Sequence, residues 1–575
     1  MDPRTAAHTL DQIAAFLELK GESPFKVKAY SQAARAVAAL ETDDLETLDR
    51  DGVLAATPRL GKATLSVVRD LIAGGESRYL NELRAEIPES LVELLDVAGL
   101  AAPKIRVLHE QLGVDSLATL ESAARDGRLA KVKGFGPKTA EKILRGIERI
   151  KTAGTQVLYL RGLETSLAVV AAVRAHEHVL RAEVAGSTRR HRETIGDVDV
   201  VASCSGDPVS VANDFAEGPG VRIADGGRTA APRIMYVDGT QLDLYCVPAP
   251  EFTVAWWRAT GSAAHVAAVV ARLAARGITL QGDSLRAPDG HRITVDDEAT
   301  LYSLAGLPFI LPELREEGRE FVLAERGALP RLVEIADIRG TLHCHSTYSD
   351  GKATITEMAQ AAAERGWSYI GITDHSQSAF YAGGMSSMQL LAQHAEIDAL
   401  NASGIGIRIL KGIEADILAD GTLDYDAATL DRFDFVVGSV HSRFSMDRTT
   451  MTNRVLRALD DPHLTILGHP TGRLLLSRDP YPIDMDAVLE KCADRGVAVE
   501  LNADPKRLDL DWRLIPRALD LGVSIEIGTD SHSTKSLDYM KIGVGMARKA
   551  GVEAGHVLNA RSVDDMLAFA RARRG

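Results

Sequence analysis

Residues 369–375 read Tyr-Ile-Gly-Ile-Thr-Asp-His, a short apolar run that ends in two polar side chains. Short apolar runs bounded by polar residues are typical of buried strands. Similar runs alternate with amphipathic helical patterns from about residue 339 to the end of the chain. This alternation predicts a parallel α/β fold, either a barrel or an open sheet. Because the carboxyl ends of barrel strands converge on one mouth, the polar residues after each run are expected to meet.

The polar residues at these strand ends have the chemistry of metal ligands. The nine candidates are His343, His345, Asp350, His375, Glu414, His441, His469, Asp530 and His532. Imidazoles and carboxylates together suit Zn²⁺, Mn²⁺ or Fe²⁺, and nine ligands are too many for one ion. The sequence therefore predicts two or three metal ions at this mouth. Cys344 lies between two ligands on one strand, so we expect it to face away and pack.

A second set of acids lies in the first half of the chain. Asp197 and Asp199 alternate with Val198 and Val200, so a strand places both carboxylates on one face. Asp243 repeats the pattern on a later strand. Three neighbouring acids would repel one another, which favours a pair of Mg²⁺ or Mn²⁺ ions that bridge phosphate oxygens.

A glycine turn precedes these acids. Gly186 and Ser187 end an apolar strand over 179–184, and Arg189 and Arg190 follow. A glycine turn, a hydroxyl group and arginines suit a triphosphate. Ser187 and Arg190 are therefore candidate nucleotide-binding residues.

The first 154 residues read as helices with glycine turns. Val132-Lys133-Gly134-Phe135-Gly136-Pro137-Lys138 precedes an apolar helix, and 97–104 is a weaker copy. Both resemble the helix-hairpin-helix motif, whose backbone N–H groups bind phosphate at a helix N-terminus. The pattern predicts non-specific duplex binding, with a purely structural turn as the alternative. The candidate DNA contacts are Lys26, Tyr30, Gly61, Gly99, Gly134, Gly136 and Lys138.

Composition sets limits on the class of protein. A chain of 575 residues is long enough for three or four domains, and no apolar run approaches the roughly 20 residues of a membrane span. Four scattered cysteines and an N-terminus without a signal pattern indicate a reducing cytoplasm. The net charge of −14 argues mildly against binding of nucleic acid. Cations bound at the metal motifs would offset part of this negative charge.

Residues 1 to about 315 resemble the family X DNA polymerases. The resemblance implies that Asp197 and Asp199 hold both metals, and that Asp243 binds the catalytic metal and helps to deprotonate the primer 3′-hydroxyl. It places Ser187 and Arg190 at the triphosphate. It also assigns the nucleotide pocket to the stretch that contains Arg258 and Gly261.

The chain departs from that family at three places. Arg258-Ala259-Thr260-Gly261-Ser262 stands where the family typically has Tyr-Phe-Thr-Gly-Ser, so two aromatic side chains that wall the sugar are missing. Val266 replaces a base-contacting asparagine. Val67 occupies the position of the Schiff-base lysine of eukaryotic relatives, so we expect no lyase chemistry there.

Residues 339–575 resemble the polymerase and histidinol phosphatase (PHP) domain, and all nine of its metal positions are filled. The resemblance implies a distorted (β/α) barrel for this segment. The likeness implies three ligand sets, which are His343, His345, Glu414 and Asp530; Asp350, His375 and His532; and Glu414, His441 and His469. It also implies phosphoester hydrolysis, and beside a polymerase the expected substrate is a DNA 3′ end.

These observations predict six segments: a helical lyase-like domain (1–90), a helix-hairpin-helix domain (91–154), a nucleotidyltransferase palm (155–250), a nucleotide-selecting subdomain (251–316), a linker (317–338) and a PHP domain (339–575). We expect a monomeric cytoplasmic repair polymerase that takes gapped or nicked duplex DNA and deoxynucleoside triphosphates, does not bind membranes, and carries 3′-5′ exonuclease activity. One alternative is a DNA-end-binding scaffold with a decayed polymerase pocket. Another is a small-molecule phosphatase fused to a DNA-binding module.

Overall fold

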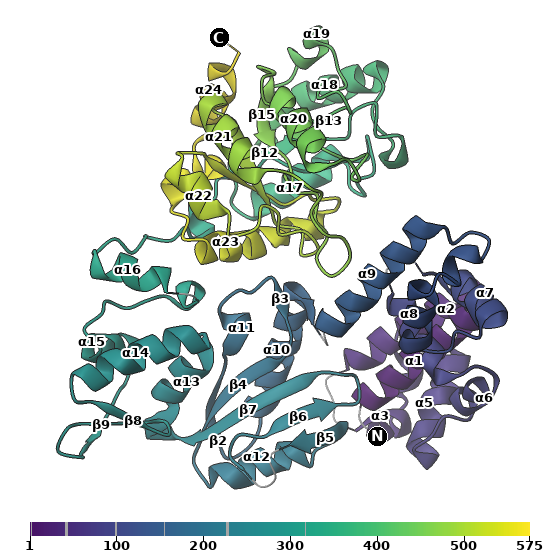
Figure 1. Cartoon of the computed structure of the whole chain (residues 1–575), viewed down its shortest axis with the longest axis vertical. Helices are drawn as coiled ribbons and strands as arrows, with labels where there is room; N and C mark the ends of the chain where they lie inside the picture. The colour runs from purple at the N-terminus through teal and green to yellow at the C-terminus, as the bar shows by residue number, and fades with distance from the viewer. Residues whose placement is uncertain are drawn as a thin grey trace. The chain divides into compact units, whose positions relative to one another are not determined.

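The computed structural model describes the chain except for residues 2, 41–43, 98–99, 154–155, 226–228, 317 and 575. It contains two compact units (Figure 1). One unit comprises Met1–Gln156, Val169–Glu183 and Gly196–Ala249, and the other comprises Val157–Ala168, Val184–Ile195 and Pro250–Gly575. None of the described helices is long and apolar enough to cross a membrane.

The N-terminal segment is a small helical bundle. Its helices are α1 (Pro3–Lys20), α2 (Pro24–Ala38), α3 (Leu45–Arg50), α4 (Val53–Ala56), α5 (Lys62–Gly74) and α6 (Arg78–Glu86). The predicted apolar positions of α1 and α2, among them Leu10, Phe16 and Val37, are fully buried in one core. Tyr30 and Val67 lie in the same core, 4% and 3% exposed.

A second helical core follows. It consists of η1 (Glu89–Asp96), α7 (Ala102–Leu112), α8 (Leu117–Arg125), η2 (Leu129–Lys131) and α9 (Pro137–Ala153). The turn before α9 needs glycine, because Gly134 has a φ of 93° that other residues rarely adopt. Phe135 is buried between two exposed glycines, so the motif is anchored by its ring while its backbone faces solvent.

The palm segment is built on a five-stranded sheet with the strand order β2-β4-β7-β6-β5. Its strands are β2 (Val179–Val184), β4 (Val198–Cys204), β5 (Val221–Asp225), β6 (Arg233–Tyr236) and β7 (Gln241–Pro248), while β1 (Val157–Leu158) pairs with β3 (Thr194–Ile195). The helices are α10 (Tyr159–Arg174), α11 (Gly186–Arg189) and α12 (Pro208–Ala216). The apolar residues of 234–246 predict a single strand; this prediction is wrong, because a turn at 237–240 divides the segment into β6 and β7.

The next segment packs around Trp257 and Tyr302, which are both fully buried. It contains α13 (Phe252–Thr260), α14 (Ala263–Ala275), the sheet β8 (Thr279–Gln281), β9 (Ser284–Arg286) and β10 (Arg292–Ile293), and α15 (Glu298–Leu304). The expected linker contains α16 (Arg319–Glu325), whose Phe321 stacks on His265 in this core. This part of the linker is therefore packed structure.

The C-terminal segment is a sheet of seven parallel strands in sequence order, with a nearly closed barrel form. The strands are β11 (Gly340–Thr341), β12 (Tyr369–Ile372), β13 (Arg408–Asp416), β14 (Phe435–Ser439), β15 (Leu464–Leu467), β16 (Ala498–Asn502) and β17 (Ile525–Gly528). The segments after the first and last strands meet, because the His345 N–H donates to the Ser531 carbonyl at 2.8 Å and the Ser531 N–H donates to that of His343. The predicted barrel is confirmed.

In the described part of the chain, six α-helices connect successive barrel strands, and α23 and α24 follow the last strand. They are α17 (Ile355–Glu364), α18 (Ser387–Ala402), α19 (Ala427–Leu430), α20 (Arg448–Ala458), α21 (Met485–Arg495), α22 (Ile515–Asp520), α23 (Met540–Lys549) and α24 (Val563–Ala572). The strands are buried along their whole length, apart from a few residues of β13, as expected for a sheet covered by helices. This rigid core leaves the loops at the strand ends to carry the polar residues.

Candidate metal centres

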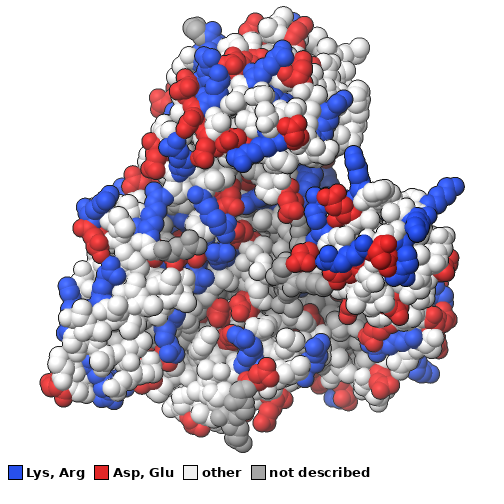
Figure 2. All heavy atoms as spheres, in the orientation of Figure 1, with Lys and Arg blue, Asp and Glu red and all other residues white. Residues whose placement is uncertain are grey.

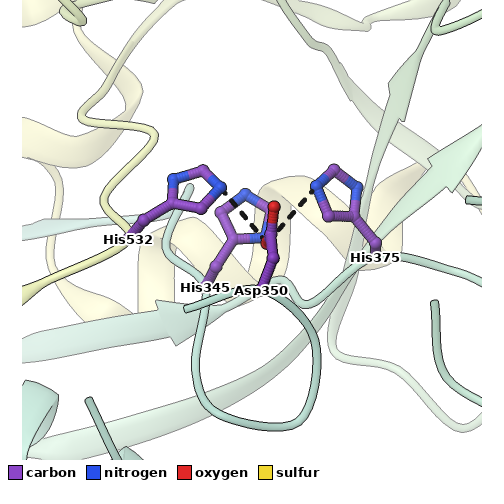
Figure 3. Close-up of side chains that lie close together, drawn as sticks. All are labelled: His345, Asp350, His375 and His532. Carbon is purple, nitrogen blue, oxygen red and sulfur yellow. Dashed lines mark ion pairs between the residues drawn. The ribbon is translucent and has the colours of Figure 1, made fainter. Parts of the chain in front are cut away.

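The nine predicted ligands lie together at the carboxyl ends of the barrel strands. Three groups have ligand atoms within 4.8 Å of one another: His345, Asp350, His375 and His532; His343, His345 and Asp530; and His375, Glu414 and His441. Figure 3 shows the first group, with the imidazoles of His532 and His375 on either side of Asp350. His345 lies in two groups, although the sequence assigned it to one.

Glu414 is the centre of the cluster. One of its carboxylate oxygens, Oε1, lies 3.1 Å from His441 Nε2 and 3.0 Å from His469 Nε2. The other, Oε2, lies 2.9 Å from His375 Nδ1 and 3.7 Å from His345 Nε2. Because its two oxygens lie near different imidazoles, the Glu414 carboxylate is arranged to bridge metal ions, as the family resemblance implies.

Several ligand atoms are buried without a hydrogen bond of acceptable geometry. These atoms are His343 Nε2, both ring nitrogens of His345, His375 Nδ1, His469 Nδ1 and Glu414 Oε2. Buried polar groups are costly unless they are satisfied, and such a concentration of them at one place needs an explanation. Divalent cations would supply it, so the residues present fit a multinuclear metal site.

The backbone at two ligands is strained. His469 and Asp530 have φ angles of 23° and 48°, in a region that residues other than glycine rarely adopt. Strain of this kind costs about 1–3 kcal/mol per residue and is concentrated at functional sites. The fold therefore holds these two side chains against an energetic preference.

Carboxylates behind the ligands fix two of the imidazoles. Glu500 on β16 lies 2.6 Å from His343 Nδ1, and Asp416 on β13 lies 2.6 Å from His441 Nδ1. Metal-binding histidines commonly donate a hydrogen bond from the second ring nitrogen to a carboxylate, which fixes the tautomer and the orientation of the ring. The sequence analysis missed both acids, although Glu500 interrupts the apolar start of β16 and Asp416 follows the candidate ligand Glu414 by two residues.

Asp374 has a different role from its neighbour His375. Its carboxylate accepts hydrogen bonds from the Ser346 backbone N–H at 2.7 Å, the Ser349 hydroxyl and the Gln393 amide. Ser346 and Ser349 belong to the loop after β11, whereas Gln393 belongs to α18. Asp374 therefore ties this loop to α18, and His375 is the candidate ligand.

The protonation of the cluster is strongly perturbed. Burial would lower the pKa of His441, but the charge of Glu414 and the hydrogen bond to Asp416 raise it to about 10. Burial and the adjacent His375 lower the pKa of His345 to about 4. Despite its burial, Glu414 has its pKa held well below the ordinary value by His441 and other imidazoles. The cluster therefore keeps a charged carboxylate in the interior.

The three palm acids have the predicted geometry. β4 and β7 are parallel neighbours, and Asp199 is the register partner of Asp243. Val198 and Val200 are buried on the opposite face. Asp197 stands just before β4 and accepts a 3.5 Å hydrogen bond from the Gln241 amide. The sheet thus places these carboxylates side by side, as a two-metal site requires.

Arg233 on β6 pairs with the third palm acid. Its guanidinium donates two hydrogen bonds to the Asp243 carboxylate, at 2.9 and 2.7 Å. This bidentate contact occupies both oxygens that would face a metal ion. The pocket beside it is lined by Asp225, Ala231, Pro232, Arg233, Asp243 and Tyr245. The sequence analysis did not identify Arg233.

The glycine turn of α11 carries the two candidate triphosphate residues. Gly186 has a φ of 56°, and the Ser187 hydroxyl is buried without a hydrogen-bond partner. Arg190 donates to Glu316 at 3.1 Å and to the Thr260 carbonyl. The hydroxyl is thus available to a ligand, whereas the Arg190 guanidinium already has protein partners.

The altered nucleotide pocket has its own ion pair. Arg258, at the end of α13, lies 2.9 Å from Asp283 in the turn between β8 and β9. Gly261 and Ser262 follow α13, and a Cβ on Gly261 would meet Val266 at 3.0 Å. A larger residue at this turn would therefore need Val266 to move by a few tenths of an ångström.

The candidate DNA contacts differ in accessibility. Gly134, Gly136 and Lys138 are exposed, and Gly61 begins α5 with its backbone facing solvent. Lys26 pairs with Glu22 at 3.1 Å, Tyr30 is buried, and Gly99 lies outside the described residues. Lys, Arg, Asp and Glu are intermixed on the face that Figure 2 shows. The exposed motif before α9 is the most accessible of these sites.

Comparison with known proteins agrees with these sites. Three family models match, described as a PHP domain (residues 341–504), a DNA polymerase beta thumb (255–316) and a SAM-like helix-hairpin-helix tandem (91–149). The chain is 30% identical over 229 residues to a probable phosphatase of Thermoanaerobacter sp. (strain X514), covering 38% of this chain and 88% of that protein.

One relative matches along the whole length. The DNA polymerase/3'-5' exonuclease PolX of Bacillus subtilis (strain 168) is 37% identical over 572 residues, which is 99% of each chain. The match includes the segment that carries the palm acids and the segment that forms the barrel. The chain therefore belongs to the family X DNA polymerases that carry a C-terminal PHP domain.

Proposed function

We propose that this chain is a DNA-directed DNA polymerase that fills short gaps during repair and also degrades DNA from the 3′ end in its PHP domain. The observation that carries the proposal is the convergence of nine ligands around Glu414, together with the Asp199–Asp243 pair on neighbouring strands. The Bacillus subtilis relative, named a polymerase and 3'-5' exonuclease, supports both activities. The proposal assigns DNA binding to residues 1–154, nucleotidyl transfer to 155–250 and nucleotide selection to 251–316.

In the palm, Asp197, Asp199 and Asp243 would hold two Mg²⁺ or Mn²⁺ ions, and in the barrel the nine ligands would hold two or three Zn²⁺, Mn²⁺ or Fe²⁺ ions. Divalent cations of this kind neutralise phosphate charge and lower the pKa of a bound water or hydroxyl group. The protein orients the ligands through Glu500 and Asp416 and offers the Ser187 hydroxyl to a triphosphate. The exposed glycine turn before α9 binds the DNA backbone.

We further propose gapped or nicked duplex as the substrate and a monomer in the cytoplasm as the working form. All four cysteines are free and buried, which suits a reducing compartment. A phosphatase of small molecules remains a second candidate for the barrel, favoured by the Thermoanaerobacter relative. A DNA-end-binding scaffold is a candidate for the first half, because Arg258 and Ala259 replace the aromatic wall and Arg258 is paired.

One experiment compares these functions. The full chain is given gapped duplex DNA with deoxynucleoside triphosphates, the same DNA without them, and histidinol phosphate, each with Mg²⁺ and with Mn²⁺. The proposal expects primer extension in the first reaction, 3′-end shortening in the second and little phosphate release in the third. No extension with either metal would favour the scaffold, and preferred hydrolysis of histidinol phosphate would favour the phosphatase.

A further inference from the structure

Two exposed aromatic side chains stand in the loop between β12 and α18. Phe380 and Tyr381, in the short helix η6 (Phe380–Ala382), are 89% and 69% exposed. Phe380 is the most exposed large hydrophobic side chain among the described residues. Single exposed apolar residues are common on protein surfaces, but adjacent ones beside a functional site mark a binding surface.

The loop that carries the two rings is firmly held. Ala379, Ala382 and Met385 are buried, and the Met385 N–H donates to the His375 carbonyl at 2.8 Å. The backbone passes so close to itself that a Cβ on Gly384 would meet the Ser376 carbonyl at 2.0 Å. The anchored backbone therefore presents the rings in a defined place.

That place is the rim of the metal cluster. The ring centroid of Tyr381 lies 6.1 Å from that of His375 and 6.2 Å from that of His441. Both histidines contact Glu414. His375 faces Asp350 in Figure 3, and the loop continues directly from it in sequence. A phosphodiester bound at the cluster would bring the groups attached to it next to the rings.

The surrounding sequence is suited to an uncharged, flat group. Residues 376–393 contain no Asp, Glu, Lys or Arg. A surface that combines aromatic rings with no charge, next to a site for phosphate, matches a nucleotide, whose base is flat and uncharged. Aromatic side chains stack on bases of any identity, because every base has a π face.

We propose that Phe380 and Tyr381 form a stacking platform for the terminal base of a DNA 3′ strand whose phosphodiester lies at the metal centre. This inference rests on the nuclease function proposed above. A base can stack on protein rings only after it leaves its pair and its neighbours in the duplex. The platform therefore selects unpaired or frayed 3′ ends over fully paired ones.

The test uses the full chain and a single-stranded oligonucleotide, with or without a base on its 3′-terminal nucleotide. Replacing both rings (Phe380→Ala with Tyr381→Ala) should raise KM by about five- to a hundredfold, the range that base–aromatic stacking commonly contributes. The variant and the parent should differ little on the oligonucleotide with an abasic 3′ end. Tyr381→Phe keeps the ring and should keep the parent KM.

Met388→Ala is the matched control, because Met388 is 80% exposed in the same segment but has no ring. A direct binding signal comes from 2-aminopurine at the 3′ end, protected by a phosphorothioate linkage. The parent should quench its fluorescence, and the double variant should not.

Equal kinetics of the parent and the double variant would overturn the platform, and so would an equal loss on both oligonucleotides or an equal effect of Met388→Ala. These results differ from a failure of the nuclease proposal. In that case the parent itself would not shorten DNA, or His345→Ala would shorten it as fast as the parent does.

Discussion

The Glu500 carboxylate lies 2.6 Å from Nδ1 of His343, and neither side chain is exposed to solvent. The other oxygen of Glu500 accepts hydrogen bonds from the His469 backbone N–H and the Asn502 amide. One acid thus orients His343 and the loop that carries His469. Because Nδ1 is held by Glu500, Nε2 of His343 faces the cluster.

We therefore expect Glu500→Gln to weaken metal binding by roughly 10- to 100-fold, as is typical when such a supporting partner is lost. Metal content after dialysis against a graded series of chelator concentrations measures this. Glu490→Gln, a surface substitution on α21, is the control and should retain its metal. Unchanged metal retention in Glu500→Gln would show that Glu500 is not needed to orient the ligands.

Arg233 pairs with Asp243 and would compete with a metal ion for this carboxylate. Arg233→Met should therefore lower the Mg²⁺ concentration at half-maximal primer extension several-fold, since removing a bidentate cation leaves the oxygens open. Titration of extension rate against Mg²⁺ gives the value. A higher half-saturation concentration in the variant would mean that Arg233 orients Asp243 for the metal.

We expect the polymerase site to discriminate poorly between deoxyribonucleotides and ribonucleotides. Ala259 stands where the family resemblance implies an aromatic ring, and Arg258 pairs with Asp283. A change in pocket size commonly yields about 10- to 200-fold selectivity, so we expect discrimination against ribonucleotides within that range. Single-nucleotide incorporation of dNTP and rNTP measures it, and Ala259→Phe should increase it. Discrimination above about a thousandfold in the parent, well beyond that range, would contradict the open pocket.

Lys549 gives a prediction on pH. It is 3% exposed, and its ammonium group contacts Glu316 and the Arg190 carbonyl. Burial lowers its pKa from the ordinary value of 10.5 to about 8, although Glu316 acts in the opposite direction. Between these pH values the unfolded chain holds a proton that the folded protein has released, so unfolding takes up a proton and stability rises with pH.

The melting temperature of the parent, relative to that of Lys549→Met, should therefore increase from pH 8 to pH 10.5. Calorimetric scans of both proteins across this range provide the comparison, and Lys541→Met on the exposed start of α23 should show no such trend. If the melting temperature of the parent, relative to that of Lys549→Met, fell as the pH rose, the native site would favour the charged form of Lys549.

The barrel could be predicted because short apolar runs alternate with helical patterns, and most of the nine candidate ligands could be named because they follow or end such a run, at strand ends that share one mouth. His441 after β14 and His469 after β15 are examples. Glu500 and Asp416 were missed because each is a single acid, within β16 and at the end of β13, and a single acid in a sequence does not indicate its partner. Their hydrogen bonds to His343 and His441 depend on side-chain directions that only the folded barrel defines.

Other features depended on contacts between distant residues. Phe321 and Ala324 face one side of α16, but charged neighbours hid this short pattern and the segment was interpreted as a linker. The pairing of Arg233 with Asp243 requires the antiparallel register of β6 and β7, which the single expected strand did not contain. Tyr30 was a candidate DNA contact, and its burial follows from packing in the first helical core.

The central claim is that the barrel ligands degrade 3′ ends and the palm acids extend them, each without the other. The most direct test measures extension and shortening of one labelled primer on gapped DNA by the parent, His345→Ala and Asp199→Ala. The account predicts that His345→Ala loses shortening and keeps extension, while Asp199→Ala loses extension and keeps shortening. Shortening retained in His345→Ala, or lost only in Asp199→Ala, would contradict it.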